Sequence, residues 1–218
     1  MTPRLALIHA VSVAVPPVTA ALAELWPEAR VQNLLDDALS PDREAESDLT
    51  PAMRSRIGTL ASYAHTCGAD AILFTCSAFG PAIDEVKRAL PIPVRKPNEA
   101  MFASALDSGR SIGMLATFEP SVASMEEEFT QMASARGADA MLRTVCVPDA
   151  MRALRAGKGD DHDRLLAAAV PKLADCDAIL LAHFSTSRAY DAVRARVSVP
   201  VLTSPRSAVL ALRAAVHR

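Results

Sequence analysis

Short apolar runs alternate along the chain with longer stretches in which apolar residues recur at helical spacing. The runs lie at 5–9, 30–35, 71–74, 92–94, 111–116, 142–147, just before residue 183, and at 199–202. Helical spacing is clearest over 51–66 and 121–136. Short apolar runs between turn residues are typical of parallel strands covered on both faces. The alternation predicts an α/β fold built on parallel sheets with right-handed crossovers.

This pattern repeats after 107 residues. The tetrapeptide Asp-Ala-Ile-Leu begins at Asp70 and again at Asp177, and the dipeptide Pro-Val begins at 93 and again at 200. The apolar run at 5–8 falls on 112–115 at the same spacing. Because three matches share one register, we infer an internal duplication. The chain is expected to form two similar halves whose parallel sheets face each other across a cleft.

Cys76 follows the strand predicted at 71–74 and precedes a helix that opens at Pro81. Open α/β sheets bind ligands at the carboxyl ends of their strands, and a helix N-terminus favours thiolate over thiol. The 107-residue spacing places His183 at the equivalent position, and histidine exchanges a proton near neutral pH. The structural alternatives are a buried core cysteine and a histidine that only hydrogen-bonds at a strand end.

Hydroxyl side chains occupy the strand-end loops that should converge on Cys76. Hydroxyls and backbone N–H groups at strand ends bind carboxylates without a metal. The candidate substrate-binding residues of this kind are Ser12, Ser77, Thr117 and Ser185. A turn or cap role is the alternative for each of them. The charged stretch 40–48 is expected to be a surface loop or a lid.

Composition excludes several function classes. The 218 residues are 50% hydrophobic and 4% aromatic and carry a formal net charge of −2, so neither a nucleic-acid partner nor a membrane partner is expected. The four cysteines form no C-x-x-C pair and no Cys/His metal spacing. We therefore expect no metal site, no disulfide framework and a cytoplasmic location. The apolar stretch 5–15 imitates a signal peptide, but two prolines interrupt it and the repeat needs it as a strand.

Four motifs carry a family resemblance, which covers nearly the whole chain. They are Thr-Cys-Ser-Ala-Phe-Gly at 75–80, Lys-Pro-Asn-Glu-Ala-Met-Phe at 96–102, Leu-Ala-Thr-Phe-Glu-Pro-Ser at 115–121 and Val-Leu-Thr-Ser-Pro at 201–205. The chain resembles the aspartate/glutamate racemase superfamily, which includes hydantoin racemases, maleate isomerases and arylmalonate decarboxylases. The resemblance implies two Rossmann-like or flavodoxin-like domains related by a pseudo-two-fold, at 1–96 plus 205–218 and at 97–204. It also implies a homodimer and a site in the interdomain cleft that needs no cofactor.

Racemases of this group use two cysteines, one from each domain. Cys76 matches the first, and its motif also gives Ser77 and Ala78 as substrate-binding residues. His183 stands where the second cysteine belongs, so this chain resembles a one-cysteine member.

The resemblance implies a racemase or isomerase that moves a proton at the α-carbon of a small carboxylate or amino acid, with Cys76 and His183 as catalytic residues. Two alternatives stay open. One is an arylmalonate-decarboxylase-like lyase whose single cysteine donates a proton, and the other is a carboxylate-binding protein without catalysis.

Overall fold

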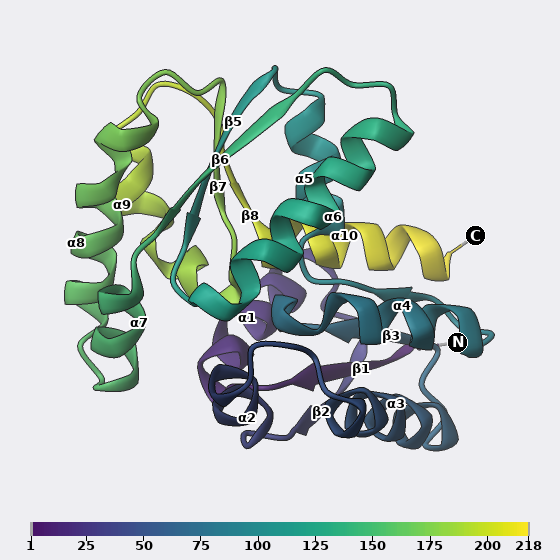
Figure 1. The fold of residues 1–218 in the computed structure, drawn as a ribbon. Coiled ribbons are helices and arrows are strands. Elements are labelled where there is room, and N and C mark those ends of the chain that lie inside the picture. Colours follow the sequence, from purple (N-terminus) through teal and green to yellow (C-terminus); the bar gives the residue numbers. More distant parts are fainter. Residues whose placement is uncertain (1, 218) are drawn as a thin grey trace.

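A computed structural model describes residues 2–217, and within them the strands form two four-stranded parallel sheets (Figure 1). The first sheet has the order β2-β1-β3-β4 and the second the order β6-β5-β7-β8. The strands of the first sheet are β1 (Arg4–His9), β2 (Arg30–Leu35), β3 (Ala71–Phe74) and β4 (Val94–Arg95). Those of the second are β5 (Ser111–Ala116), β6 (Met141–Cys146), β7 (Ala178–Leu181) and β8 (Val201–Thr203). The predicted α/β class and the two similar parallel sheets are confirmed.

The two sheets repeat a side-chain contact as well as a strand order. Asp70 precedes β3, and its Oδ2 accepts a hydrogen bond from the backbone N–H of Arg4 at 2.7 Å. Asp177 precedes β7, and its Oδ2 accepts a bond from the N–H of Ser111 at 2.8 Å. The two donors are 107 positions apart in the sequence, and so are the two aspartates that accept. The repeated aspartate therefore fixes the start of the central strand pair in both halves.

Helices cover both faces of each sheet (Figure 1). In the first half they are α1 (Val15–Leu25), α2 (Leu39–Ala45), α3 (Pro51–Thr66) and α4 (Gly80–Ala89). They continue as α5 (Glu99–Leu106), α6 (Val122–Ala135), α7 (Pro148–Arg155), α8 (Gly159–Ala169), α9 (Tyr190–Arg194) and α10 (Ser204–Val216). Short 3₁₀ turns are η1 (Ser12–Ala14), η2 (Ser77–Phe79), η3 (Glu119–Ser121), η4 (Val170–Leu173) and η5 (Phe184–Ala189). No helix of residues 2–217 has the length and apolarity that a membrane crossing requires.

The stretch expected to be a charged loop at 40–48 forms helix α2 over most of its length. Leu39 at its first position is fully buried, and this anchor holds a short helix whose other side chains are largely polar. The cap predicted for α3 is present, because the Thr50 hydroxyl accepts from the N–H of Met53 at 3.3 Å.

Burial explains why the central strands are continuous apolar runs. All four residues of β3 and all four of β7 are buried. Alternate residues of β3 belong to different cores, since Ile72 packs with α3 and α4 whereas Leu73 packs with α1 and α10. The last helix thus returns to the first sheet. The residue boundaries of the two domains stay a prediction.

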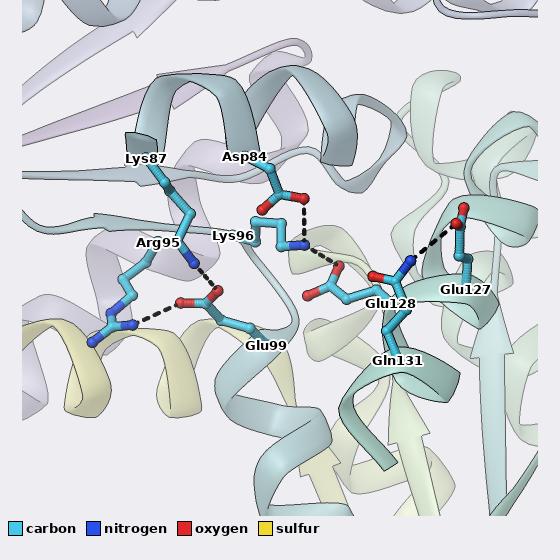
Figure 2. A network of polar contacts seen from close by, with 8 residues as sticks. All are labelled: Asp84, Lys87, Arg95, Lys96, Glu99, Glu127, Glu128 and Gln131. Atoms are coloured by element: carbon cyan, nitrogen blue, oxygen red, sulfur yellow. Dashed lines mark hydrogen bonds and ion pairs between the residues drawn. The ribbon is translucent and has the colours of Figure 1, made fainter. Parts of the chain in front are cut away.

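The two halves are joined by ion pairs of Lys96 and by a close contact between helices α4 and α6. Figure 2 shows the ion pairs. Lys96, which follows β4, lies 3.1 Å from a carboxylate oxygen of Asp84 on α4 and 3.9 Å from one of Glu128 on α6. A Cβ on Gly80 at the start of α4 would lie 2.9 Å from the hydroxyl of Ser124 on α6. Glycine at position 80 therefore lets the two helices meet at their N-terminal ends.

Candidate active site

A small cavity of about 30 Å³ lies where the loops after β3 and β7 face each other. Both halves contribute to its wall. The lining residues are Val11, Ala14, Ser40, Thr75, Cys76, Ser77, Phe118, Met151, Arg155, His183, Phe184 and Ser185. The structure thus brings Cys76 and His183, which the repeat relates, to one enclosed space. A cavity of this size holds about one or two water molecules.

Cys76 stands in extended conformation directly before the short turn η2 and is partly buried. Burial raises the pKa of its thiol to about 11. The backbone N–H of Ala78, which hydrogen-bonds the sulfur, and the nearby charge of Arg43 both act in the opposite direction but are outweighed. The backbone N–H favours thiolate in the expected direction, but loss of solvent dominates in this closed cavity and the thiol form prevails.

His183 occupies the equivalent position before η5. Its Nδ1 lies 3.2 Å from the backbone nitrogen of Thr117, which can only donate, so Nδ1 is the acceptor of the ring. Its Nε2 therefore carries the hydrogen and lies 2.9 Å from the hydroxyl oxygen of Ser121. Burial lowers the pKa of His183 to about 4, so the ring is neutral at pH 7. Both ring nitrogens are occupied by protein groups.

Two of the predicted hydroxyl residues line the cavity. Ser77 and Ser185 are both buried, and the Ser77 hydroxyl has no hydrogen-bond partner among the described residues. A buried hydroxyl without a partner is costly unless a ligand or water satisfies it. Ser77 is therefore the side chain best placed to bind a polar group that enters the cavity.

The other predicted binding residues lie elsewhere. Thr117 is buried but contacts His183, with its hydroxyl 3.1 Å from Nδ1, and does not line the cavity. Ala78 is buried and acts through its backbone N–H on the thiol of Cys76. Ser12 is exposed on η1, and its neighbours Val11 and Ala14 reach the cavity instead.

Sequence reasoning did not single out the two residues that close the cavity from opposite halves, although one of them lies in the stretch 40–48 that was expected to be a loop or a lid. Ser40 on α2 and Arg155 on α7 both line it, with Arg155 Nη2 3.3 Å from the Ser40 hydroxyl. Arg155 Nη1 also lies 3.4 Å from Glu44. Next to them, Arg43 donates to the carbonyl of Pro120 in the other half at 3.3 Å. No local pattern marks these residues, since their partners are distant in sequence.

Thr75, also missed, connects the cavity to the buried end of β1. Its hydroxyl lies 2.8 Å from Nδ1 of His9, whose Nε2 lies 2.9 Å from Oδ1 of Asn33. Burial lowers the pKa of His9, which favours the neutral ring. The signal that indicates His9 in the sequence is its place at the end of the first predicted strand.

Comparison with known proteins identifies the family. The profile of the family described as Asp/Glu/Hydantoin racemase matches residues 17–140, which is more than half of the chain. The chain belongs to this family. No curated protein sequence gave a significant match.

Solved structures of the Asp/Glu/Hydantoin racemase fold superpose on nearly the whole chain. Glutamate racemase from Thermus thermophilus in complex with Beta-chloro-D-alanine has a TM-score of 0.79 at 19% identity, covering 99% of this chain and 81% of that one. Aspartate racemase from Picrophilus torridus has a TM-score of 0.74 at 17% identity, covering 99% and 94%. A double mutant of arylmalonate decarboxylase in its liganded form has a TM-score of 0.65 at 17% identity, covering 99% and 93%. At these identities the likeness establishes the fold.

Proposed function

We propose that this family member is a cofactor-independent racemase- or isomerase-type enzyme that transfers a proton at the α-carbon of a small carboxylate or amino acid. The observation that carries the proposal is the shared cavity of Cys76 and His183 at equivalent strand ends. Cys76 is the proton-transferring group, and the unpartnered hydroxyl of Ser77 is the first candidate to bind the substrate carboxylate. Ser185 lines the same wall.

Substrate entry requires the cavity to open, because a volume of about 30 Å³ is too small for any amino acid. The contacts that must break are those of Arg155 with Ser40 and Glu44, and that of Arg43 with Pro120. Opening frees both Nη groups of Arg155 and one Nη group of Arg43, whose other Nη group donates to the carbonyl of Glu46 in its own segment. Arginine binds carboxylates through paired N–H donors, which supports a carboxylate as the substrate.

The thiol and its surroundings suit proton donation to carbon. In the closed cavity Cys76 is protonated, since the pKa of its thiol is about 11. When the thiol gives its proton to the α-carbon of an enediolate, the electron pair of the enediolate forms the new C–H bond and a thiolate remains. The Ala78 N–H and the charge of Arg43 stabilise that thiolate. In the reverse step the thiolate removes the proton and the C–H electron pair returns to the enediolate.

A second candidate is a decarboxylase that uses Cys76 alone, and the state of His183 favours it. Inversion needs an acid or base on the other face of the carbon, whereas both nitrogens of His183 are hydrogen-bonded to protein groups. In a decarboxylase the electron pair of the broken C–C bond forms the enediolate as CO₂ leaves, and Cys76 protonates one face. This reaction requires no proton transfer by His183, which only lines the cavity.

The experiment that tests the proposal follows loss of the α-proton signal by NMR in D₂O, with amino acids, hydantoins and dicarboxylates as substrates. Malonates are assayed in parallel for CO₂ release and for a chiral product. We expect exchange that falls at least about 100-fold in Cys76→Ala, the usual scale of a lost acid–base group. The control is Cys146→Ala, which removes a partly buried thiol outside the cavity.

The variants separate the candidates. A comparable loss in His183→Ala supports two-base racemisation, whereas retained turnover with CO₂ release supports the decarboxylase. If compounds bind but neither exchange nor CO₂ release occurs, both enzyme proposals fail and a carboxylate-binding protein without catalysis remains.

We also propose that the chain acts as a cytoplasmic homodimer with domains 1–96 plus 205–218 and 97–204. Packing of α10 with α1 supports the return of the C-terminal segment to the first domain. The cysteines are free, as is usual in a reducing compartment. Light scattering coupled to size exclusion tests the dimer, and a mass of one chain, 23.1 kDa, would contradict it.

A further inference from the structure

A second cavity, of about 260 Å³, lies between α4 and α6 at the junction of the two halves. Figure 2 shows some of its lining side chains, namely Asp84, Lys96, Glu127, Glu128 and Gln131. It shares no lining residue with the cavity of Cys76. Four carboxylate residues line it, Asp84, Glu85, Glu127 and Glu128, together with two cations, Arg88 and Lys96. The volume is sufficient for a small organic molecule. Because charged side chains line the cavity, it is not a packing defect.

Glu128 is the unusual member of this group. Its side chain is 8% exposed, and its Oε1 is buried without a hydrogen-bond partner in the part of the chain that the structure describes. The nearest cation is Lys96, whose Nζ lies 3.9 Å from Oε2, beyond hydrogen-bond distance. A carboxylate has only acceptors, so it needs a donor to compensate for its burial. Burial raises the pKa of Glu128 to about 7, which is the direction expected when that donor is missing.

The neighbouring carboxylates are better satisfied. Asp84 accepts from Lys96 at 3.1 Å, and Glu85 pairs with Arg54 at 2.6 Å. Glu127 accepts from the amide of Gln131 at 3.0 Å, its one side-chain hydrogen bond within residues 2–217, and is exposed at the cavity rim. Lys96 is shared between Asp84 and Glu128, so the unmet demand for hydrogen-bond donors is centred on the α6 carboxylates.

We propose that this cavity binds an organic ammonium group, with Glu128 as its main partner and Glu127 as a second acceptor. An ammonium carries three hydrogen-bond donors and one positive charge, which is what a buried carboxylate lacks. Primary amines and the α-ammonium of amino acids share this chemistry. The site is independent of the proposed function, since none of its residues belongs to the cavity of Cys76.

A ligand at this place would act on both sides of the active-site cavity. Helix α4 begins at Gly80, just after the loop of Cys76, and α6 begins after Ser121, which holds His183. The two helices approach closely at Gly80 and Ser124. A molecule bound between them would therefore change the distance between the loop of Cys76 and the loop of Ser121. Only this effect on turnover rests on the proposed function.

Isothermal titration calorimetry with 1,4-diaminobutane at pH 7 tests the site, in phosphate and in HEPES buffers. We expect one site per chain and release of roughly half a proton, because a carboxyl group with a pKa near 7 ionises fully on binding. In Glu128→Gln we expect affinity at least about tenfold weaker and no proton release. Glu127→Gln, at the exposed rim, should bind several-fold more weakly.

The matched control is Glu126→Gln on the same helix, which removes a carboxylate that does not line the cavity and should leave affinity unchanged. The neutral analogue 1,4-butanediol should not bind. Absence of diamine binding to the wild-type protein, or equal binding by Glu128→Gln, overturns the proposal. L-Lysine and L-alanine, titrated in the same way, distinguish a simple amine from an amino acid. Retained diamine binding in Cys76→Ala separates this site from the proposed enzyme activity.

Discussion

The hydroxyl oxygen of Ser121 lies 2.9 Å from Nε2 of His183 and 2.7 Å from the carbonyl oxygen of Phe118. Because the hydroxyl donates to the carbonyl, it accepts the Nε2 hydrogen of the ring. On the other side of the ring, the backbone N–H of Thr117 donates to Nδ1. His183 is thus held as one neutral tautomer between Ser121 and Thr117, two residues of its own half. In the closed state His183 therefore lines the wall of the cavity in a fixed orientation, with both ring nitrogens hydrogen-bonded to protein groups.

Stability at acid pH should depend on His183. Its pKa is about 4 in the folded protein and about 6.5 when unfolded, so the unfolded state binds the additional proton. The free energy of unfolding should therefore fall as the pH drops from about 6.5 through 4, by up to about 3 kcal/mol from this group. Urea denaturation at pH 7.5, 5.5 and 4.5 measures the free energy of unfolding. In His183→Gln its decrease toward acid pH should be smaller by about the same amount. An unchanged pH dependence would contradict the low pKa of His183.

Reactivity of Cys76 should depend on the contact between α2 and α7. Replacing Arg155 by Ala removes its bonds to Ser40 and Glu44, so we expect the cavity to open more often. Alkylation of Cys76 by iodoacetamide, followed by peptide mass spectrometry, should accelerate several-fold. Arg152→Ala is the control, because Arg152 lies on the same helix and, among residues 2–217, forms an ion pair only with Asp149. Equal rates in both variants would show that the contact does not close the cavity.

The charge of Arg43 should affect the pKa of the Cys76 thiol. This charge lowers the pKa that burial has raised to about 11, so Arg43→Gln should raise it further. The pH profile of alkylation by iodoacetamide separates this shift from opening of the cavity, because loss of the contact with Pro120 changes the limiting rate and the charge changes the midpoint. We expect the midpoint to rise by up to about one pKa unit. Arg43→Lys keeps the charge and should keep nearly the wild-type midpoint. Equal midpoints in both variants would show that the charge of Arg43 is not what the thiol senses.

Stability above neutral pH should depend on Glu128. Its pKa is about 7 when folded and about 4.5 when unfolded, so the folded state binds the additional proton. Stability from this group is complete below pH 4.5 and declines as the pH rises through 7, by up to about 3 kcal/mol. Thermal unfolding at pH 5 and pH 8.5 measures it. Glu128→Gln should abolish the decline, whereas Glu126→Gln should retain it; a decline in both would contradict the pKa assignment.

Much of the fold and part of the candidate site can be predicted from the sequence, because those features depend on local chemistry. Apolar runs without alternation require strands covered on both faces, which the fully buried β3 and β7 confirm. The repeat of Asp70 at Asp177 predicts equal strand starts, since each aspartate binds an N–H of its own sheet. The same repeat places Cys76 and His183 at equivalent strand ends.

What only the tertiary structure decided depends on groups far apart in the chain. Arg155 contacts Ser40 at a sequence separation of 115 residues, and Ser121 contacts His183 at a separation of 62. No local spacing in the sequence predicts either contact. Burial is likewise collective: it keeps the thiol of Cys76 protonated although the neighbouring N–H and Arg43 favour thiolate. Periodicity and turn residues act over a few positions and set the elements. The relative placement of the two sheets sets which side chains share a cavity and how much solvent they lose.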